Sequence, residues 1–274
     1  MSVFEVNGII RKTNVEVMFD SPQTPDPTGN SSVLDGWSVA QLDGHRVEVF
    51  DSCSTNADAL GCVLFLHGHG RIMLSQNAIY TELLRQHRLI AVCPDGQRSW
   101  WLDRICPEFD ASVSPQQWLL ESLLPAVEKH WSLASPKIAL LGVSMGGQGV
   151  LQLSYRYARQ FPVVAAISPA VDFHQMYGQG LPLDDIFADQ EEARQATVVL
   201  NLHPLAWPKH QFFCCDPLDA EWFDGCARLG MKLSSSGILH DRDLETSVDG
   251  HTWNYFNHVA PRVIDHIVAG LKAC

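Results

Sequence analysis

The sequence predicts an α/β fold, in which a mostly parallel central sheet is flanked by helices, preceded by antiparallel strands and topped by a small cap insertion. Three observations lead to this prediction: short apolar runs recur along the chain, helical stretches separate them, and alternating patterns are confined to the first fifth. Continuous apolar runs are typical of parallel strands, because helices cover both faces of such sheets. With 274 residues, 46% of them hydrophobic, the chain can form a single domain over residues 1–274.

Residues 1–50 are expected to form antiparallel strands. Apolar and polar residues alternate there, as they do in strands that bury only one face. The dipeptide Asp43-Gly44 favours the tight turn of a β-hairpin. The predicted segments are a strand at 15–19, a surface loop at 21–32, and two hairpin strands at 36–42 and 45–50.

The parallel strands are expected where short apolar runs follow residue 60. After the second of these runs, Leu120, Leu124 and Val127 fall on one helical face, and Pro115 lies near the predicted helix start. The predicted strands cover 62–66, 89–93, 138–143, 163–167 and 211–215, with a further strand at 243–248 and helices at about 222–233 and 253–271.

Residues 172–209 break this regular alternation. Prolines and glycines precede a helical patch at 184–196, and no strand pattern stands out. This segment is therefore the expected cap, inserted over the edge of the sheet where the parallel strands end.

The segment 142–146 reads G-x-S-x-G and makes Ser144 the candidate nucleophile. An apolar strand-like run at 137–141 leads into it, and a helical segment begins at 147. A sharp strand-to-helix turn of this kind holds the serine in a strained backbone conformation and exposes its hydroxyl. The helix N-terminus favours the negative charge that develops during acyl transfer.

An oxyanion-binding loop is expected at 66–70, which reads LHGHG and follows the first parallel strand. In such sites one donor is the N–H of the residue after the nucleophile, here Met145, and the other comes from this loop. His69 is the favoured second donor, with Gly70 as the alternative. His67 and His69 lack an obvious third ligand nearby, so we expect no metal, and His67 is expected to brace the loop.

The general base is predicted from chain order. In enzymes whose nucleophilic serine lies in a strand-turn-helix of this kind, the triad residues follow one another as serine, acid and histidine. His251 lies in the turn that precedes the last helix, after Gly250. Asp216 and Asp219 both follow the fifth parallel strand and are the candidate acids. Asp219 is favoured because the acid usually lies three or four residues beyond the strand. The other aspartate is expected to cap the following helix.

Composition argues against several other functions. The net charge is −12 without a Lys/Arg cluster, which argues against nucleic-acid binding. No apolar run approaches the roughly 20 residues that span a bilayer, and the N-terminus lacks a secretory pattern. The eight cysteines show no metal-like spacing and are expected to be free thiols in a reducing, cytoplasmic setting. No cofactor is expected, and a homodimer is left open.

With these residues in place, the chain resembles the esterase D-like branch of the α/β-hydrolase fold. That branch includes S-formylglutathione hydrolases, feruloyl and acetylxylan esterases, enterochelin esterases and mycolyltransferases. The resemblance extends from about residue 47 to the C-terminus. Its motifs are FLHGHG at 65–70, CPDGQRSWW at 93–101, GVSMGGQG at 142–149 and DGHTWNYF at 249–256. The oxyanion loop differs from that of S-formylglutathione hydrolases, which lacks the HG-x-G pattern.

The resemblance also implies which residues form the pocket. It assigns the triad to Ser144, His251 and one of the two aspartates, and it places Asp95, Trp100, Trp101 and Trp253 near the substrate. Trp222 is a further candidate for an aromatic site, and ordinary packing is the alternative for all four tryptophans. Arg71 and Arg98 are candidates for a substrate carboxylate, with paired surface charge as the alternative.

Together these features predict a serine hydrolase that cleaves a small-molecule carboxylic ester through an acyl-enzyme intermediate. An acyltransferase or a thioesterase that uses the same triad is the alternative. Nothing in the sequence suggests the peptide-binding or gating domain that a peptidase would need.

Overall fold

The computed structural model of the protein describes residues 34–51 and 59–274. The strand predicted at 15–19 and the loop predicted at 21–32 lie outside the described residues. Among the described residues, no helix is both long enough and apolar enough to cross a membrane.

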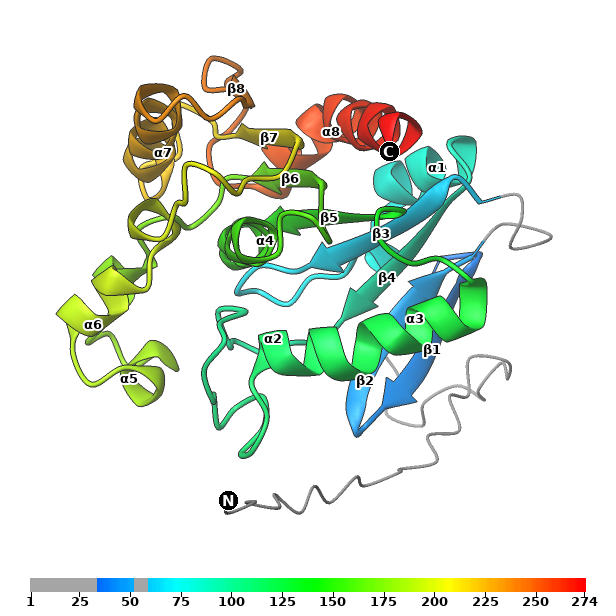
Figure 1. Ribbon diagram of the computed structural model, residues 1–274, viewed down its shortest axis with the longest axis horizontal. Coiled ribbons are helices and arrows are strands. Elements are labelled where there is room, and N and C mark those ends of the chain that lie inside the picture. The colour runs from blue at the N-terminus through cyan, green and yellow to red at the C-terminus, as the bar shows by residue number, and fades with distance from the viewer. Residues whose placement is uncertain (1–33, 52–58) are drawn as a thin grey trace, which may run out of the picture.

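A mixed eight-stranded sheet forms the centre of the molecule, in the order β1-β2-β4-β3-β5-β6-β7-β8 (Figure 1). β1 and β2 form an antiparallel hairpin, and β2 also runs antiparallel to β4. All later pairs are parallel. The strands are β1 (Trp37–Leu42), β2 (His45–Phe50), β3 (Gly61–Leu66), β4 (Leu89–Pro94), β5 (Ile138–Val143), β6 (Val163–Ile167), β7 (His210–Cys214) and β8 (Asp241–Asp243).

The predicted fold class is therefore confirmed, and the apolar runs are strands to within one residue at either end. The last strand was predicted in the wrong place. It ends at Asp243 because the carboxylate of this residue accepts hydrogen bonds from the N–H groups of Glu245 and Thr246, at 3.0 and 2.9 Å. Such a side-chain turn competes with strand pairing and ends the strand.

Helices cover both faces of the sheet (Figure 1). α1 (Ala78–Gln86) and α8 (Trp253–Ala273) pack on one face. The other face carries α2 (Pro115–Trp118), a π-helical turn η3 (Leu119–Leu123), α3 (Leu124–Trp131), α4 (Met145–Arg156) and α7 (Phe223–Ser235). A short 3₁₀ turn η2 (Leu74–Gln76) precedes α1.

Alternate residues of the buried strands face these two layers. In β3, Val63 and Phe65 join the core under α1 and α8, whereas Leu64 and Leu66 join the core under α4 and α7. A strand buried on both sides reads as a continuous apolar run for this reason.

The segment predicted as a cap lies between β6 and β7. It contains η4 (Phe173–Met176), α5 (Leu183–Ile186), α6 (Gln190–Gln195) and η5 (Val198–Leu200). The helical patch predicted at 184–196 is thus two short helices. Figure 1 shows α5 and α6 away from the sheet, beyond α4. The role of residues 172–209 as a cap stays a prediction.

The cysteines among the described residues are free thiols, and all of them except Cys274 are buried. Cys214 and Cys215 are neighbours in sequence without being joined.

Candidate active site

Ser144 occupies the turn between β5 and α4 with φ 54° and ψ −119°. A side-chain-bearing residue adopts this backbone conformation at a cost of order 1–3 kcal/mol. The flanking glycines make the turn possible: a Cβ at Gly146 would collide with the carbonyl of Leu66, and one at Gly142 would collide with Gly146. The Ser144 N–H donates to the Ile167 carbonyl at 2.9 Å, which fastens the turn to β6.

A continuous hydrogen-bond chain joins Ser144 to His251 and Asp219. The Ser144 Oγ lies 3.0 Å from His251 Nε2, and His251 Nδ1 lies 2.7 Å from Asp219 Oδ2. An ionised carboxylate can only accept, so the ring proton sits on Nδ1 and leaves Nε2 to accept from the serine hydroxyl. The arrangement can withdraw the Ser144 proton and stabilise the imidazolium that results.

Asp219 is buried, and its environment keeps it ionised. Burial opposes ionisation, but the hydrogen bond from His251 and the backbone N–H of Trp222 outweigh it, so the pKa of Asp219 lies below its usual value. Its Oδ1 accepts from the N–H groups of Glu221 and Trp222 at 3.2 and 3.1 Å, in the turn that precedes α7. Asp219 therefore both contacts His251 and holds the turn that leads into α7.

Asp216, the other candidate acid, does not contact His251. It is fully buried and accepts hydrogen bonds from the Ser247 hydroxyl at 2.8 Å, from the Gly250 N–H at 2.9 Å and from the Val248 N–H. The sequence predicts that the aspartate other than the acid caps the following helix. Instead, Asp216 leaves β7 pointing toward the β8–α8 loop and fastens the segment that carries His251.

The predicted oxyanion donors lie on two elements beside Ser144. Met145 is the first residue of α4, where backbone N–H groups have no acceptor within the helix. The loop after β3 passes close to the nucleophile, since a Cβ at Gly68 would lie 3.2 Å from the Ser144 Cβ. His69 lines the adjacent cavity. Burial and the nearby Arg98 lower the pKa of His69, so its imidazole is neutral at neutral pH.

His67 is fully buried and links three segments around the site. Its Nε2 accepts the Gly96 N–H at 3.0 Å, which places the ring proton on Nδ1, 2.8 Å from the Gly68 carbonyl. The Trp101 Nε1–H donates to the carbonyl of His67 at 3.0 Å. Within the described residues, no group of three or more His, Cys, Asp and Glu side chains could hold a metal ion.

A cavity of about 300 Å³ opens over Ser144. Trp100 and Trp253 line it, as does Trp222. Trp101 does not: it is fully buried, packed against Gly149 and bonded to His67, so we reassign it from substrate binding to support of the loop. The lining residues are Gly68, His69, Gly70, Arg71, Ile72, Trp100, Val143, Ser144, Met176, Leu181, Glu221, Trp222, His251, Thr252, Trp253 and Phe256.

Several of these lining residues were not singled out from the sequence, among them Phe256, Met176 and Leu181. Phe256 lies three positions after Trp253 on α8, so helical spacing next to His251 could have revealed it. Met176 and Leu181 come from the 172–209 segment, where no local pattern marks them.

The two arginine candidates are both paired. Arg71 contacts Asp95 with Nη2 at 2.6 Å and Nε at 3.2 Å, and its side chain reaches the cavity. Arg98 pairs with Glu108 at 2.8 Å. Burial opposes ionisation of Asp95, yet its hydrogen bonds hold its pKa well below the usual range. The arginines are therefore not free cations.

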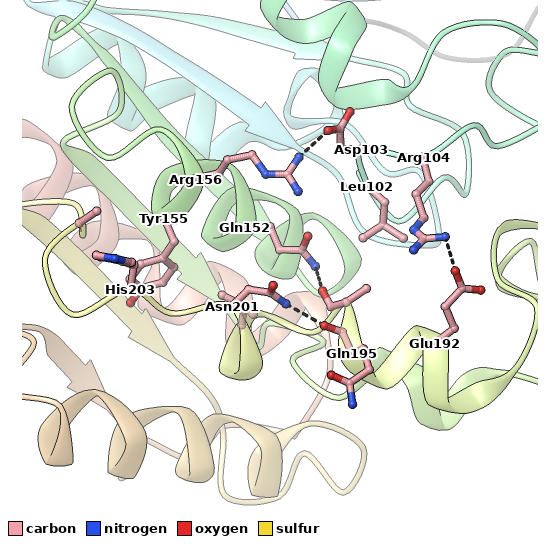
Figure 2. Close-up of a pocket in the computed structure, with 13 residues that line it drawn as sticks. Leu102, Asp103, Arg104, Gln152, Tyr155, Arg156, Glu192, Gln195, Asn201 and His203 are labelled. Carbon is pink, nitrogen blue, oxygen red and sulfur yellow. Dashed lines mark hydrogen bonds and ion pairs between the residues drawn. The ribbon is translucent and has the colours of Figure 1, made fainter.

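A second, larger cavity of about 570 Å³ lies between the 102–104 loop, the second half of α4 and the 192–206 segment (Figure 2). Charged and amide side chains line it, several of them bonded to one another across it.

Comparisons with known proteins agree with the fold described above. A family model described as "Putative esterase" matches residues 46–223. A solved ferulic acid esterase superposes with a TM-score of 0.69 at 14% identity, covering 86% of this chain and 97% of its own. An S-formylglutathione hydrolase from Agrobacterium tumefaciens gives 0.67 at 15% identity, covering 89% and 97%. MPT51 (FbpC1) from Mycobacterium tuberculosis gives 0.62 at 14%, covering 81% and 93%. No curated protein sequence matches.

Proposed function

The chain belongs to the esterase family and is a carboxylic ester hydrolase, and from this premise we propose that Ser144, His251 and Asp219 are its catalytic triad. The observation that carries the proposal is the unbroken hydrogen-bond chain from the strained Ser144 through His251 to a buried carboxylate, at the floor of a cavity. Nucleophile, base and orienting acid in this order are the requirements for nucleophilic acyl transfer.

In the first step, His251 Nε2 takes the hydroxyl proton of Ser144 while Oγ bonds to the ester carbonyl carbon. The carbonyl oxygen becomes an oxyanion, held by the N–H groups of Met145 and His69. When the intermediate collapses, the bond to the alcohol oxygen breaks and His251 returns the proton to the departing alcohol. The acyl group remains on Ser144.

In the second step, water attacks the acyl-enzyme with His251 as the base. The acid product leaves and Ser144 regains its proton. Asp219 keeps the imidazole in the tautomer with a free Nε2 and balances its positive charge in both steps. Trp100, Trp253 and Trp222 would contact the substrate, since they line the cavity beside Ser144.

The proposal is tested by Ser144→Ala with p-nitrophenyl acetate as substrate. Loss of the nucleophile is expected to lower kcat by about 10⁴-fold or more. Ser235→Ala is a matched control, because the Ser235 hydroxyl donates to the Lys232 carbonyl at the exposed end of α7. The control should retain wild-type turnover. Full turnover by Ser144→Ala would contradict the proposal.

A further inference from the structure

Cys215 directly follows β7 and contacts the carboxylate that supports the proposed base. Its Sγ lies 3.5 Å from Asp219 Oδ2, and both groups are buried. This is the oxygen that also lies 2.7 Å from His251 Nδ1. An ionised carboxylate cannot donate, so the thiol S–H is the donor in this contact.

Neighbouring groups leave the Cys215 hydrogen available to Asp219. The backbone N–H of Cys215 donates to the Asp243 carbonyl at 3.0 Å, which anchors the residue beside β8. The thiol of Cys226, on α7, interacts with Cys215, but its own Sγ lies 3.5 Å from the Pro169 carbonyl. Because Cys226 donates its hydrogen to that carbonyl, Cys215 can donate to the Asp219 carboxylate. This charged group is a stronger acceptor than the Cys226 sulfur.

We propose that Cys215 is a positioning residue of the esterase, whose S–H bond to Asp219 Oδ2 moderates how strongly this carboxylate holds a proton on His251. This inference rests on the proposed triad. A donor on Oδ2 withdraws part of the negative charge that would otherwise stabilise the imidazolium. Removing the donor should therefore raise the proton affinity of the His251–Asp219 pair.

The other ionisable groups near this pair should not mask the effect. They are Cys214 of β7, Cys226 of α7 and Tyr255 of α8, together with Asp216 beside the His251 loop and with His69, Arg71 and Glu221, which line the same cavity as His251. Burial raises the pKa of Cys214 to about 12 and raises those of Cys226 and Tyr255 as well. Cys214, Cys226 and Tyr255 therefore remain neutral across the acidic limb, Asp219 remains ionised there, and His69, whose pKa is lowered, is present in every variant compared. A difference between the acidic limbs of two variants therefore reports a change at the His251–Asp219 pair.

The experiment is the pH dependence of kcat/KM for p-nitrophenyl acetate in the full-length protein. In Cys215→Ala, the acidic limb should move up by about half a pH unit, the size of one weak hydrogen bond. Cys215→Val, which fills the volume without a donor, should shift it equally if the alanine variant is unstable. Cys215→Ser retains a donor and should move the limb back toward the wild-type position.

Cys226→Ala is the matched control, since it deletes a buried thiol of the same layer that donates to Pro169 rather than to Asp219. The acidic limb of the Cys226→Ala profile should stay at the wild-type position even if this variant is less stable. The NMR resonance of the His251 Nδ1–H gives a second readout, which should move in Cys215→Ala or Cys215→Val and stay in Cys226→Ala.

An unmoved limb in Cys215→Ala and Cys215→Val, or an equal shift in Cys226→Ala, would overturn the role of Cys215 alone. Undiminished activity in His251→Gln would instead overturn the proposed triad, and the role of Cys215 with it. The two failures are therefore distinguishable.

Discussion

The two cavities of this protein differ in how their polar groups are used. In the larger one, Arg156 contacts Asp103 at 2.5 Å and Arg104 contacts Glu192 at 2.8 Å (Figure 2). The Gln152 amide donates to the carbonyl of Ala196 at 3.0 Å. These groups satisfy one another and join the 102–104 loop to α4 and α6.

The smaller cavity is lined mainly by aromatic and aliphatic side chains, with a strained serine and its histidine on the floor. Its polar groups form a directed chain that ends on a reactive hydroxyl instead of closing on itself. If the active site were chosen by volume alone, the larger cavity would be chosen. The arrangement of hydrogen-bond donors and acceptors favours the smaller cavity instead. The comparison therefore favours the smaller cavity as the site of the proposed chemistry.

The largest effect in this comparison is expected from Asp219→Asn. The amide lacks the charge that stabilises the imidazolium and no longer enforces the productive tautomer of His251, so kcat/KM should fall by about 10³- to 10⁴-fold. Steady-state kinetics with p-nitrophenyl acetate measures the loss. Asp224→Asn, at an exposed position in the first turn of α7, is the control and should behave as wild type. If kcat/KM of Asp219→Asn falls by less than tenfold, Asp219 is not the acid.

A smaller effect on rate is expected from Asp216→Asn, because this residue fastens the loop before His251 without touching the imidazole. We expect kcat/KM to fall by about 10- to 100-fold through misplacement of His251. The folded state should lose about 1–3 kcal/mol, since buried donors lose an ionised acceptor. An activity loss as large as that of Asp219→Asn would show that the two aspartates share one role.

The stability loss in Asp216→Asn should depend on pH. Burial opposes ionisation of Asp216, but the N–H groups of Leu218, Val248 and Gly250 and the hydroxyl of Ser247 outweigh it and lower its pKa. Its charge therefore stabilises the folded state above the unfolded-state pKa of roughly 3.9, and this contribution is lost as pH falls through the lowered value. The difference in Tm from wild type should be largest near neutral pH and shrink in acid, as thermal unfolding would show.

The smallest effect is expected from Arg156→Gln in the larger cavity. Its ion pair with Asp103 is about half exposed, and such pairs contribute about 1 kcal/mol or less. Activity should stay within about twofold of wild type, and the change in Tm should diminish at high salt. A tenfold fall in kcat/KM would show instead that this cavity takes part in substrate binding.

The sheet and Ser144 could be predicted because their signals are local. A strand buried on both faces is a continuous apolar run, and a strand-turn-helix with close glycines leaves few alternatives for residues 142–146. The choice between Asp216 and Asp219 is not local. It depends on how the loop after β7 meets a segment about 30 residues later, where Asp216 binds backbone N–H groups that no side-chain pattern displays.

Other features escaped for related reasons. β8 is only three residues long, because the turn centred on Asp243 keeps residues 244–248 out of the strand. Trp101 was predicted to lie near the substrate because the family resemblance at the motif CPDGQRSWW implies it. The two indoles diverge, since Trp101 fills space left by Gly149 beneath α4, whereas Trp100 lines the cavity.

The buried carboxylate of Asp216 has a consequence for how this scaffold could be redesigned. It ties the loop that bears the proposed acid to the loop that bears the proposed base, through hydrogen bonds that involve no residue of the 172–209 segment. That segment supplies Met176 and Leu181 to the cavity wall and no member of the triad. Exchanging it for the corresponding segment of another esterase would alter the shape of the cavity around the substrate. The loops that bear Asp219 and His251 would stay joined through Asp216.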